Sequence, residues 1–299
     1  MKLVTYEDRG PRVGAVIGDL ALDVQAAQPF LPGSLEEILR RGFLPSLQNL
    51  VDNASEVAKD HLRPLKGLEL YPPVMRPSKI VCLALNYRDH AAEQNREPPS
   101  NPVLFAKASS ALCGPFDDIV IRPGVEQVDA EAELAVVIGR EGTMIEAGEA
   151  LDYVAGYMAF NDVSARKIQI GDRQYFRGKS FDTFAPCGPW LVTPGELGDP
   201  HGLSIMQRLN GEVMQQSSTG ELIFTVPEII SFLSRGLTLM PGDIIATGTP
   251  GGVGLFRDPQ IFLKEGDLVE VEIERIGTIK NRVRNFESKD IHGAGISSA

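Results

Sequence analysis

The segment DAEAELAVVIG, residues 129–139, decides the fold, because it contains an almost continuous apolar run that stops at Gly139. Such a run is typical of a strand that is buried on both faces. Glu131 and Glu133 lead into this strand. Residues two apart in a strand point to the same face, so the two carboxylates are expected to lie side by side at its end. Buried carboxylates that lie so close together repel each other, and they need a nearby cation or a raised pKa to coexist.

A third carboxylate, Asp162, follows a second predicted strand, residues 155–161, in the stretch YMAFNDVSAR. Three carboxylates without a partnering Cys or His suit a hard cation, Mg²⁺ or Mn²⁺, and leave coordination positions open for water and substrate. Glu131, Glu133 and Asp162 are therefore the candidate ligands of one such ion per subunit. Spacing alone favours the alternative, in which the two glutamates simply project into solvent.

The rest of the chain predicts many short strands and few helices. Residues 1–30 alternate as three short strands, and Ser34 to Glu37 form a capping box that opens a helix ending near Gly42. A second helix is expected over Leu44 to His61. Prolines at 72, 73 and 77 resist regular structure and place a domain boundary there, giving a small N-terminal domain (1–72) and a larger domain (73–299). A second capping box begins at Thr225, and the last dozen residues are expected to form a loose tail.

Composition excludes several classes of partner. The net charge of −11 argues against binding to nucleic acid or to an anionic membrane surface, since both require basic residues. The three cysteines are odd in number and lack a CxxC spacing, so buried reduced thiols are expected. No apolar signal-peptide core and no apolar run long enough to span a bilayer is present, and we expect a cytoplasmic protein.

His90 and Glu93, in NYRDHAAEQ, form a second group of candidate residues. Three positions apart on a helix, they share one face. A carboxylate beside an imidazole can orient it and raise its basicity, which makes a general base. An exposed polar helix face is an equally good interpretation of the residues alone.

Basic and polar side chains near the carboxylates supply what an anionic substrate requires. Lys179 lies among small and aromatic residues in RGKSFDTFAP, and Lys107 is a weaker candidate of the same kind. If DVSARKIQ is a helix, Asp162, Arg166 and Gln169 fall on one side of it. Surface salt bridges are the alternative for each. The glycine-rich loop at residues 247–254 allows its backbone to approach a ligand, with Thr249 offering a hydroxyl; a plain tight turn is the alternative.

Taken together, these segments resemble the fumarylacetoacetate hydrolase family, over about residues 78–285 and in the family's order. Within it, the chain most resembles the fumarylacetoacetate hydrolase domain-containing protein 2 type. The stretches that carry the resemblance are LNYRDHAAEQ, FAKASSALCGP, DAEAELAVVIG, NDVSARKIQ, GKSFDTFAPCGP, LNGEVMQ and PGDIIATGTPGGVG.

The resemblance implies an α+β, mostly β fold: a mixed β-roll catalytic domain with a small N-terminal α/β domain, assembled as a homodimer. It implies that Glu131, Glu133 and Asp162 are the metal ligands, and that His90 and Glu93 form an acid/base dyad on a segment that orders over the substrate. It also implies that Lys179 lies beside the metal. Arg166, Gln169 and Thr249 are expected to contact the carboxylate end of the substrate.

The activity expected from these residues is hydrolysis of a C–C bond in a small 1,3-diketo, acylpyruvate-like acid through a metal-stabilised enolate. Decarboxylation, isomerisation or keto–enol tautomerisation of a 2-oxo diacid such as oxaloacetate uses the same intermediate and is the alternative. A non-catalytic ligand-binding protein on the same fold is a third hypothesis.

Overall fold

Strands dominate the computed structural model, which describes residues 1–54 and 59–291. A mixed sheet of twelve strands runs in the order β4-β3-β2-β1-β14-β12-β11-β17-β6-β7, with β5 paired to β1 and β8 paired to β14. A second, five-stranded sheet has the order β16-β15-β18-β19-β9, and β10 pairs with β13. The expectation of an α+β, mostly β fold is confirmed.

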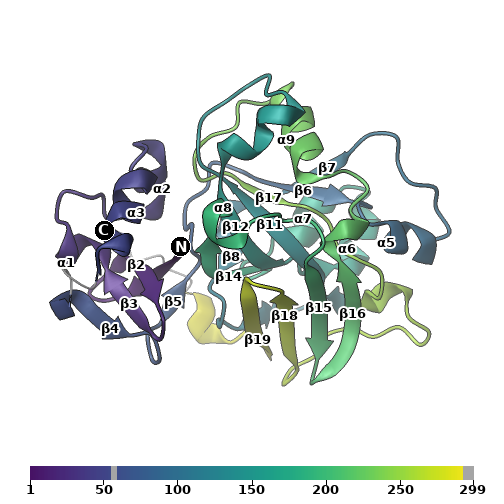
Figure 1. Cartoon of the computed structure of the whole chain (residues 1–299). Coiled ribbons are helices and arrows are strands. Elements are labelled where there is room, and N and C mark those ends of the chain that lie inside the picture. The colour runs from purple at the N-terminus through teal and green to yellow at the C-terminus, as the bar shows by residue number, and fades with distance from the viewer. Residues whose placement is uncertain (55–58, 292–299) are drawn as a thin grey trace.

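The N-terminal part of the chain forms one end of the large sheet, drawn in purple and blue on the left of Figure 1. Its strand β1 pairs on one edge with β2 and on the other with β14, which belongs to the rest of the molecule. The division of the chain near residue 72 stays a prediction. The elements of this part are β1 (Lys2–Glu7), β2 (Pro11–Ile17), β3 (Leu20–Asp23), α1 (Val24–Ala27), α2 (Leu35–Arg40), α3 (Leu44–Asp52), η1 (Lys59–His61), β4 (Leu62–Pro64) and β5 (Leu70–Tyr71).

Two local predictions in this part need correction. The helix expected over Leu44 to His61 ends at Asp52; residues 55–58 lie outside the described part, and a 3-10 turn follows. Ser34 does cap α2 by accepting the N–H of Glu37, but the side chain of Glu37 does not complete the capping box. Glu36 instead accepts the backbone N–H groups of Met75 and Arg76, and these hydrogen bonds link the helix to the segment after β5.

The middle of the large sheet carries the buried strands that the apolar runs predict. Every residue of β11 and β12 is buried, and Ala132 pairs with Asn161, so the start of one strand lies beside the end of the other. Acidic residues at these two ends are thereby brought together. The strands are β6 (Ile80–Ala84), β7 (Val103–Lys107), β8 (Leu112–Cys113), β11 (Ala132–Ile138), β12 (Val154–Asn161), β14 (Ala185–Val192) and β17 (Ile244–Ala246).

The second sheet and the remaining helices surround this centre (Figure 1). The predicted capping box at Thr225 is present at the start of α9. The strands are β9 (Ile119–Ile121), β10 (Val128–Asp129), β13 (Ser164–Ala165), β15 (Ser204–Leu209), β16 (Glu212–Ser218), β18 (Leu268–Ile273) and β19 (Gly277–Asn285). The helices are α5 (Arg88–Glu93), α6 (Arg166–Asp172), α7 (Tyr175–Lys179), α8 (Pro194–Leu197) and α9 (Val226–Ser234). The 3-10 turns are η2 (Ser109–Ala111), η3 (Ala147–Tyr153), η4 (Thr219–Glu221), η5 (Gly254–Phe256) and η6 (Ser288–Ile291).

Two further expectations can be compared with the structure. The cysteines Cys82, Cys113 and Cys187 are buried and free, as predicted. Within the described ranges, no helix combines the length and apolar character needed to cross a bilayer. Of the tail expected over the last dozen residues, Ser288–Ile291 forms the 3-10 turn η6, and residues 292–299 lie outside the described part.

Candidate metal and active site

Three carboxylates meet where β11 begins and β12 ends. Glu131 directly precedes β11, Glu133 is its second residue, and Asp162 directly follows β12. One carboxylate oxygen from each lies within 4.8 Å of the others. The three residues are at most 6% exposed, so the alternative that the two glutamates project into solvent is wrong.

Two buried lysines contact this group of acids. The Nζ of Lys179, at the end of α7, lies 2.7 Å from Glu131 Oε2 and 2.6 Å from Asp162 Oδ2. The Nζ of Lys107, the last residue of β7, lies 2.6 Å from the other oxygen of Asp162. Burial alone would lower the pKa of Lys179, but the charges of Asp162 and Glu131 outweigh it and raise the pKa to about 12. Lys179 therefore stays charged. Lys107, a weaker candidate from the sequence, thus contacts one of the three carboxylates directly.

Glu133 differs from its two neighbours. Its carboxylate accepts one backbone hydrogen bond, from Gly248 N at 2.9 Å, and has no basic partner among residues 1–54 and 59–291. Burial and the charges of Asp162 and Glu131 raise its pKa well above the ordinary range. For Glu131, burial acts in the same direction, but Arg166 and Lys179 outweigh it and lower the pKa. A buried carboxylate without a compensating cation, beside two other oxygen ligands, fits a hard divalent ion.

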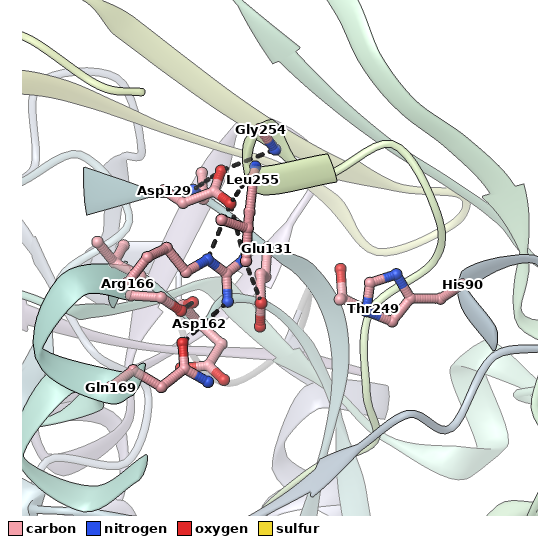
Figure 2. Close-up of polar contacts among 12 residues, drawn as sticks. His90, Asp129, Glu131, Asp162, Arg166, Gln169, Thr249, Gly254 and Leu255 are labelled. Atoms are coloured by element: carbon pink, nitrogen blue, oxygen red, sulfur yellow. Dashed lines mark hydrogen bonds and ion pairs between the residues drawn. The ribbon is translucent and has the colours of Figure 1, made fainter. Parts of the chain in front are cut away.

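Arg166 connects the acids to a carboxylate that the sequence analysis missed. Figure 2 shows its guanidinium between Asp129 and Glu131, with Thr249 and His90 facing this cluster. Its Nη2 lies 2.7 Å from Asp129 Oδ2 and 2.6 Å from Glu131 Oε1. Its Nε also donates to Asp129, at 3.0 Å, and its Nη1 donates to Gln169 Oε1, at 3.2 Å. Arg166 is thus held in one orientation at the cavity.

The helix that contains Arg166 begins later than expected. Asp162 is not part of it, because the short strand β13 intervenes and α6 starts at Arg166. Arg166 and Gln169 do share a helical face. Asp162 reaches the same site from the end of β12, so sheet geometry and not helical spacing places its carboxylate there.

Asp129 is the anchor of this arrangement. It is 4% exposed, and it accepts three backbone N–H groups in addition to the two from Arg166. These come from Ala130, Gly254 and Leu255, at 2.9–3.0 Å. The signal that could have found it is its spacing: residues 129, 131 and 133 alternate along the segment that runs from the end of β10 into β11.

His90 lies on the other side of the cavity, on α5. Its Nδ1 lies 3.0 Å from Glu93 Oε2, and its Nε2 lies 2.8 Å from the side-chain nitrogen of Gln94. Because a carboxylate only accepts, the proton of the neutral imidazole belongs on Nδ1. Nε2 then carries a lone pair that accepts from Gln94, a residue that the sequence analysis did not single out. The expected pairing of His90 and Glu93 is present.

The glycine-rich loop at residues 247–254 contacts both sides. Gly248 N donates to Glu133, Gly252 N donates to Glu93 at 2.9 Å, and Gly254 N donates to Asp129. Gly248 has a φ of +101°, and a Cβ there would lie 2.8 Å from that of Asn86. Thr249 is 5% exposed, and its hydroxyl accepts from Gln215. The alternative of a plain tight turn is therefore wrong, because the backbone of this loop binds site residues directly.

These residues enclose a cavity of about 330 Å³. Its polar lining comes from both sides and its apolar lining from β6, β7, α6, α7 and η5. The lining residues are Leu83, Ala84, Leu85, His90, Gln94, Arg96, Val103, Phe105, Glu131, Arg166, Gln169, Ile170, Tyr175, Lys179, Thr249, Leu255 and Phe256. The volume suits a small acid and not a polymer.

A family model described as "Fumarylacetoacetate (FAA) hydrolase C-terminal" matches residues 79–284, which include every site residue above. The chain belongs to the fumarylacetoacetate hydrolase family. A relative from Bos taurus, "Oxaloacetate tautomerase FAHD2A, mitochondrial", is 44% identical over 290 residues, 95% of this chain and 91% of the relative. The resemblance to the fumarylacetoacetate hydrolase domain-containing protein 2 type is thereby confirmed.

Solved structures of the fumarylacetoacetate hydrolase family share the fold over nearly the whole chain. The fumarylacetoacetate hydrolase of Exiguobacterium antarcticum is 37% identical with a TM-score of 0.84, covering 96% of this chain and 100% of its own. The maleylpyruvate hydrolase of Sphingobium sp. SYK-6, solved with manganese (II) and pyruvate, is 30% identical with a TM-score of 0.81 and the same coverage. The chain is thus an enzyme of this family, with an acidic triad able to hold a metal ion.

The expected cytoplasmic location is contradicted by these relatives. The oxaloacetate tautomerases of cattle, rat and human that match this chain are all named as mitochondrial proteins. The expectation depended on the lack of a signal-peptide pattern, which does not address other routes of targeting.

Proposed function

We propose that the chain catalyses the keto–enol tautomerisation of oxaloacetate or a closely related 2-oxo diacid. This was the alternative in the sequence analysis, and the tautomerase relatives at 44% identity support it over the hydrolysis of an acylpyruvate. The single observation in the site that carries it is the buried imidazole of His90. Its basic nitrogen is held at the cavity by Glu93 and Gln94, opposite the acidic triad.

The reaction moves one proton between C3 of the diacid and its 2-oxygen. In the direction from keto to enol, the Gln94 amide would release His90 Nε2, whose lone pair would take the proton from C3, and the electron pair of that C–H bond would pass to the 2-oxygen. Glu93 would stabilise the imidazolium that forms, because its carboxylate accepts the Nδ1 proton. The imidazolium would then return the proton to the 2-oxygen, so that atoms and charge balance.

The other side of the cavity would bind the 2-oxo acid end. Arg166 Nη1, together with Gln169 and Thr249, offers polar contacts to a carboxylate. Lys179 would stay charged and reduce the cost of negative charge near the 2-oxygen. Glu131, Glu133 and Asp162 would hold Mg²⁺ or Mn²⁺, one per subunit. When bound, that ion supplies Lewis-acid polarisation of the 2-oxo group. The homodimer implied by the family is part of this proposal.

The test follows the enol absorbance of oxaloacetate with the purified chain and added Mg²⁺ or Mn²⁺. Faster loss of the enol signal, with no extra CO₂, supports the tautomerase. Release of CO₂ in step with the loss would instead support a decarboxylase.

Hydrolysis of an acylpyruvate is the second candidate, because the manganese-bound neighbour is a maleylpyruvate hydrolase. In that reaction His90 would take a proton from water, which attacks the distal carbonyl. Cleavage of acetylpyruvate or fumarylpyruvate, monitored by NMR for pyruvate and the second acid, would favour it over the tautomerase.

A further inference from the structure

Arg96 brings an uncommitted positive charge to the cavity. It lines the same cavity as His90 and Gln94, and its side chain is exposed. Its guanidinium has no hydrogen-bond or ion-pair partner in the part of the chain that the structure describes. An arginine in this state can offer a bidentate pair of N–H groups to a carboxylate.

The backbone fixes where Arg96 stands relative to the base. Helix α5 ends in a Schellman motif: Arg96 N donates to Ala91 O, Asn95 N donates to Ala92 O, and Asn95 has a φ of +52°. This motif reverses the chain directly after the helical turn that carries His90. The base and the free guanidinium therefore come from one short, hydrogen-bonded unit.

The other cations at the cavity are already paired. Lys179 contacts Glu131 and Asp162, and Arg166 uses its Nε and Nη2 on Asp129 and Glu131. Arg166 Nη1 is left for one carboxylate, next to Gln169. A substrate with two carboxylates needs a second cationic partner, because burying an unpaired carboxylate is costly.

We propose that Arg96 binds the second carboxylate of a 2-oxo diacid and selects such acids over 2-oxo acids with an uncharged end. The inference rests on the proposed function, since it concerns the substrate of the same site. In oxaloacetate the C4 carboxylate is bonded directly to C3. A single unit that holds C4 through Arg96 thus presents His90 to the adjacent carbon.

Binding is measured by calorimetry in the presence of Mn²⁺, with pyruvate and 3,3-difluorooxaloacetate as ligands. The second ligand lacks a C3 hydrogen and cannot tautomerise, so binding is separated from turnover. The variants are Arg96→Gln, Arg96→Lys and, as the matched control, Arg173→Gln. Arg173 is an exposed arginine at the end of α6 and does not line the cavity.

Arg96→Gln is expected to weaken the binding of the diacid by about 10- to 100-fold, which is the value of a hydrogen bond between charged groups. The affinity for pyruvate should stay within about twofold of the wild type. Arg96→Lys should recover part of the loss, and Arg173→Gln should change neither ligand. Equal effects on both acids, no effect on the diacid, or the same loss in Arg173→Gln would overturn the proposal. A wild-type chain that shows this selectivity but does not tautomerise oxaloacetate would overturn the proposed function alone.

Discussion

One side of the cavity is built from the ends of β7, β11 and β12 with the last residue of α7, and the other from the six-residue helix α5. On the first side, here called the sheet wall, Lys107, Glu131, Glu133, Asp162 and Lys179 are at most 6% exposed and depend on one another's charge. On the second, the helix wall, His90, Glu93 and Gln94 are joined by hydrogen bonds within one turn. The sheet wall has three carboxylates and two lysines, so one carboxylate lacks a basic partner. The helix wall has an imidazole with a hydrogen-bond partner on each ring nitrogen.

The difference separates two tasks. A wall with an uncompensated buried charge is suited to bind an ion, because the ion removes an electrostatic cost that already exists in the fold. A wall with an imidazole that hydrogen bonds hold in one orientation is suited to move a proton. Substitutions on the two walls should therefore change different measurements.

The largest effect is expected from Glu133→Gln on the sheet wall. Loss of this ligand should abolish Mn²⁺ binding and reduce tautomerisation by about 10³-fold, which corresponds to several kcal/mol of lost charge stabilisation. Without metal, the variant should melt no lower than the wild type, because the uncompensated carboxylate of Glu133 is gone. Calorimetry and thermal melts with a chelator measure both. Retained Mn²⁺ affinity in this variant would contradict the assignment of metal binding to the sheet wall.

The next largest effect is expected from His90→Ala on the helix wall. Loss of a general base should reduce kcat by about 10²–10⁴-fold, while Mn²⁺ affinity stays within about twofold of the wild type. Gln94→Ala keeps the imidazole and removes the amide that donates to it, so its kcat should lie between that of His90→Ala and that of the wild type. If His90→Ala weakened the metal and spared turnover, the roles of the walls would be reversed.

A smaller and more selective effect is expected from Asp129→Asn, which removes one of the two negative partners of Arg166 and leaves Glu131. The amide oxygen can still accept from Ala130 N and Gly254 N, but an NH₂ group replaces the oxygen that accepts from Leu255 N and Arg166, so the guanidinium is held less firmly. We expect KM for oxaloacetate to rise by about 10-fold, with kcat and Mn²⁺ affinity changed much less. A proportional fall in metal affinity would show that Asp129 belongs functionally to the sheet wall.

The smallest effect on activity is expected from Asp23→Asn, at an aspartate–arginine pair outside both walls. Asp23 is 1% exposed and lies 2.7 Å from Arg12 Nη2. Burial alone would raise its pKa, but the hydrogen bonds from Arg12 and Ala26 N outweigh it and lower the pKa. Its stabilisation is therefore present above the ordinary carboxyl pKa and is lost as pH falls through the lowered value.

Asp23→Asn should cost about 1–3 kcal/mol of unfolding free energy at neutral pH. The difference should shrink near pH 2, about two units below the ordinary value. Urea denaturation at both pH values measures it, and turnover should be unchanged. A loss of turnover as large as that of Asp129→Asn would mean that neither acid has a local role.

The sheet wall could be predicted from the sequence because alternation at a strand end is a local pattern. Glu131 and Glu133 obey it, and so does Asp129, which was overlooked because its partners lie 37 and 125 residues away. Lys107 was undervalued for the same reason. Strand β14, with the sequence APCGPWLV, carries two prolines and a glycine that conceal it, and pairing with β1 and β12 fixes it.

The glycine-rich loop has a consequence for how this site can diverge. Its backbone N–H groups hold four acids from three separate elements: Gly248 holds Glu133, Gly251 holds Asp89, Gly252 holds Glu93, and Gly254 holds Asp129. Main-chain groups are the same whatever side chain stands there, so the spacing between the base and the triad is encoded in the course of the chain. Residues such as Arg96 can then be exchanged to admit another acid while the distance over which the proton travels is inherited unchanged.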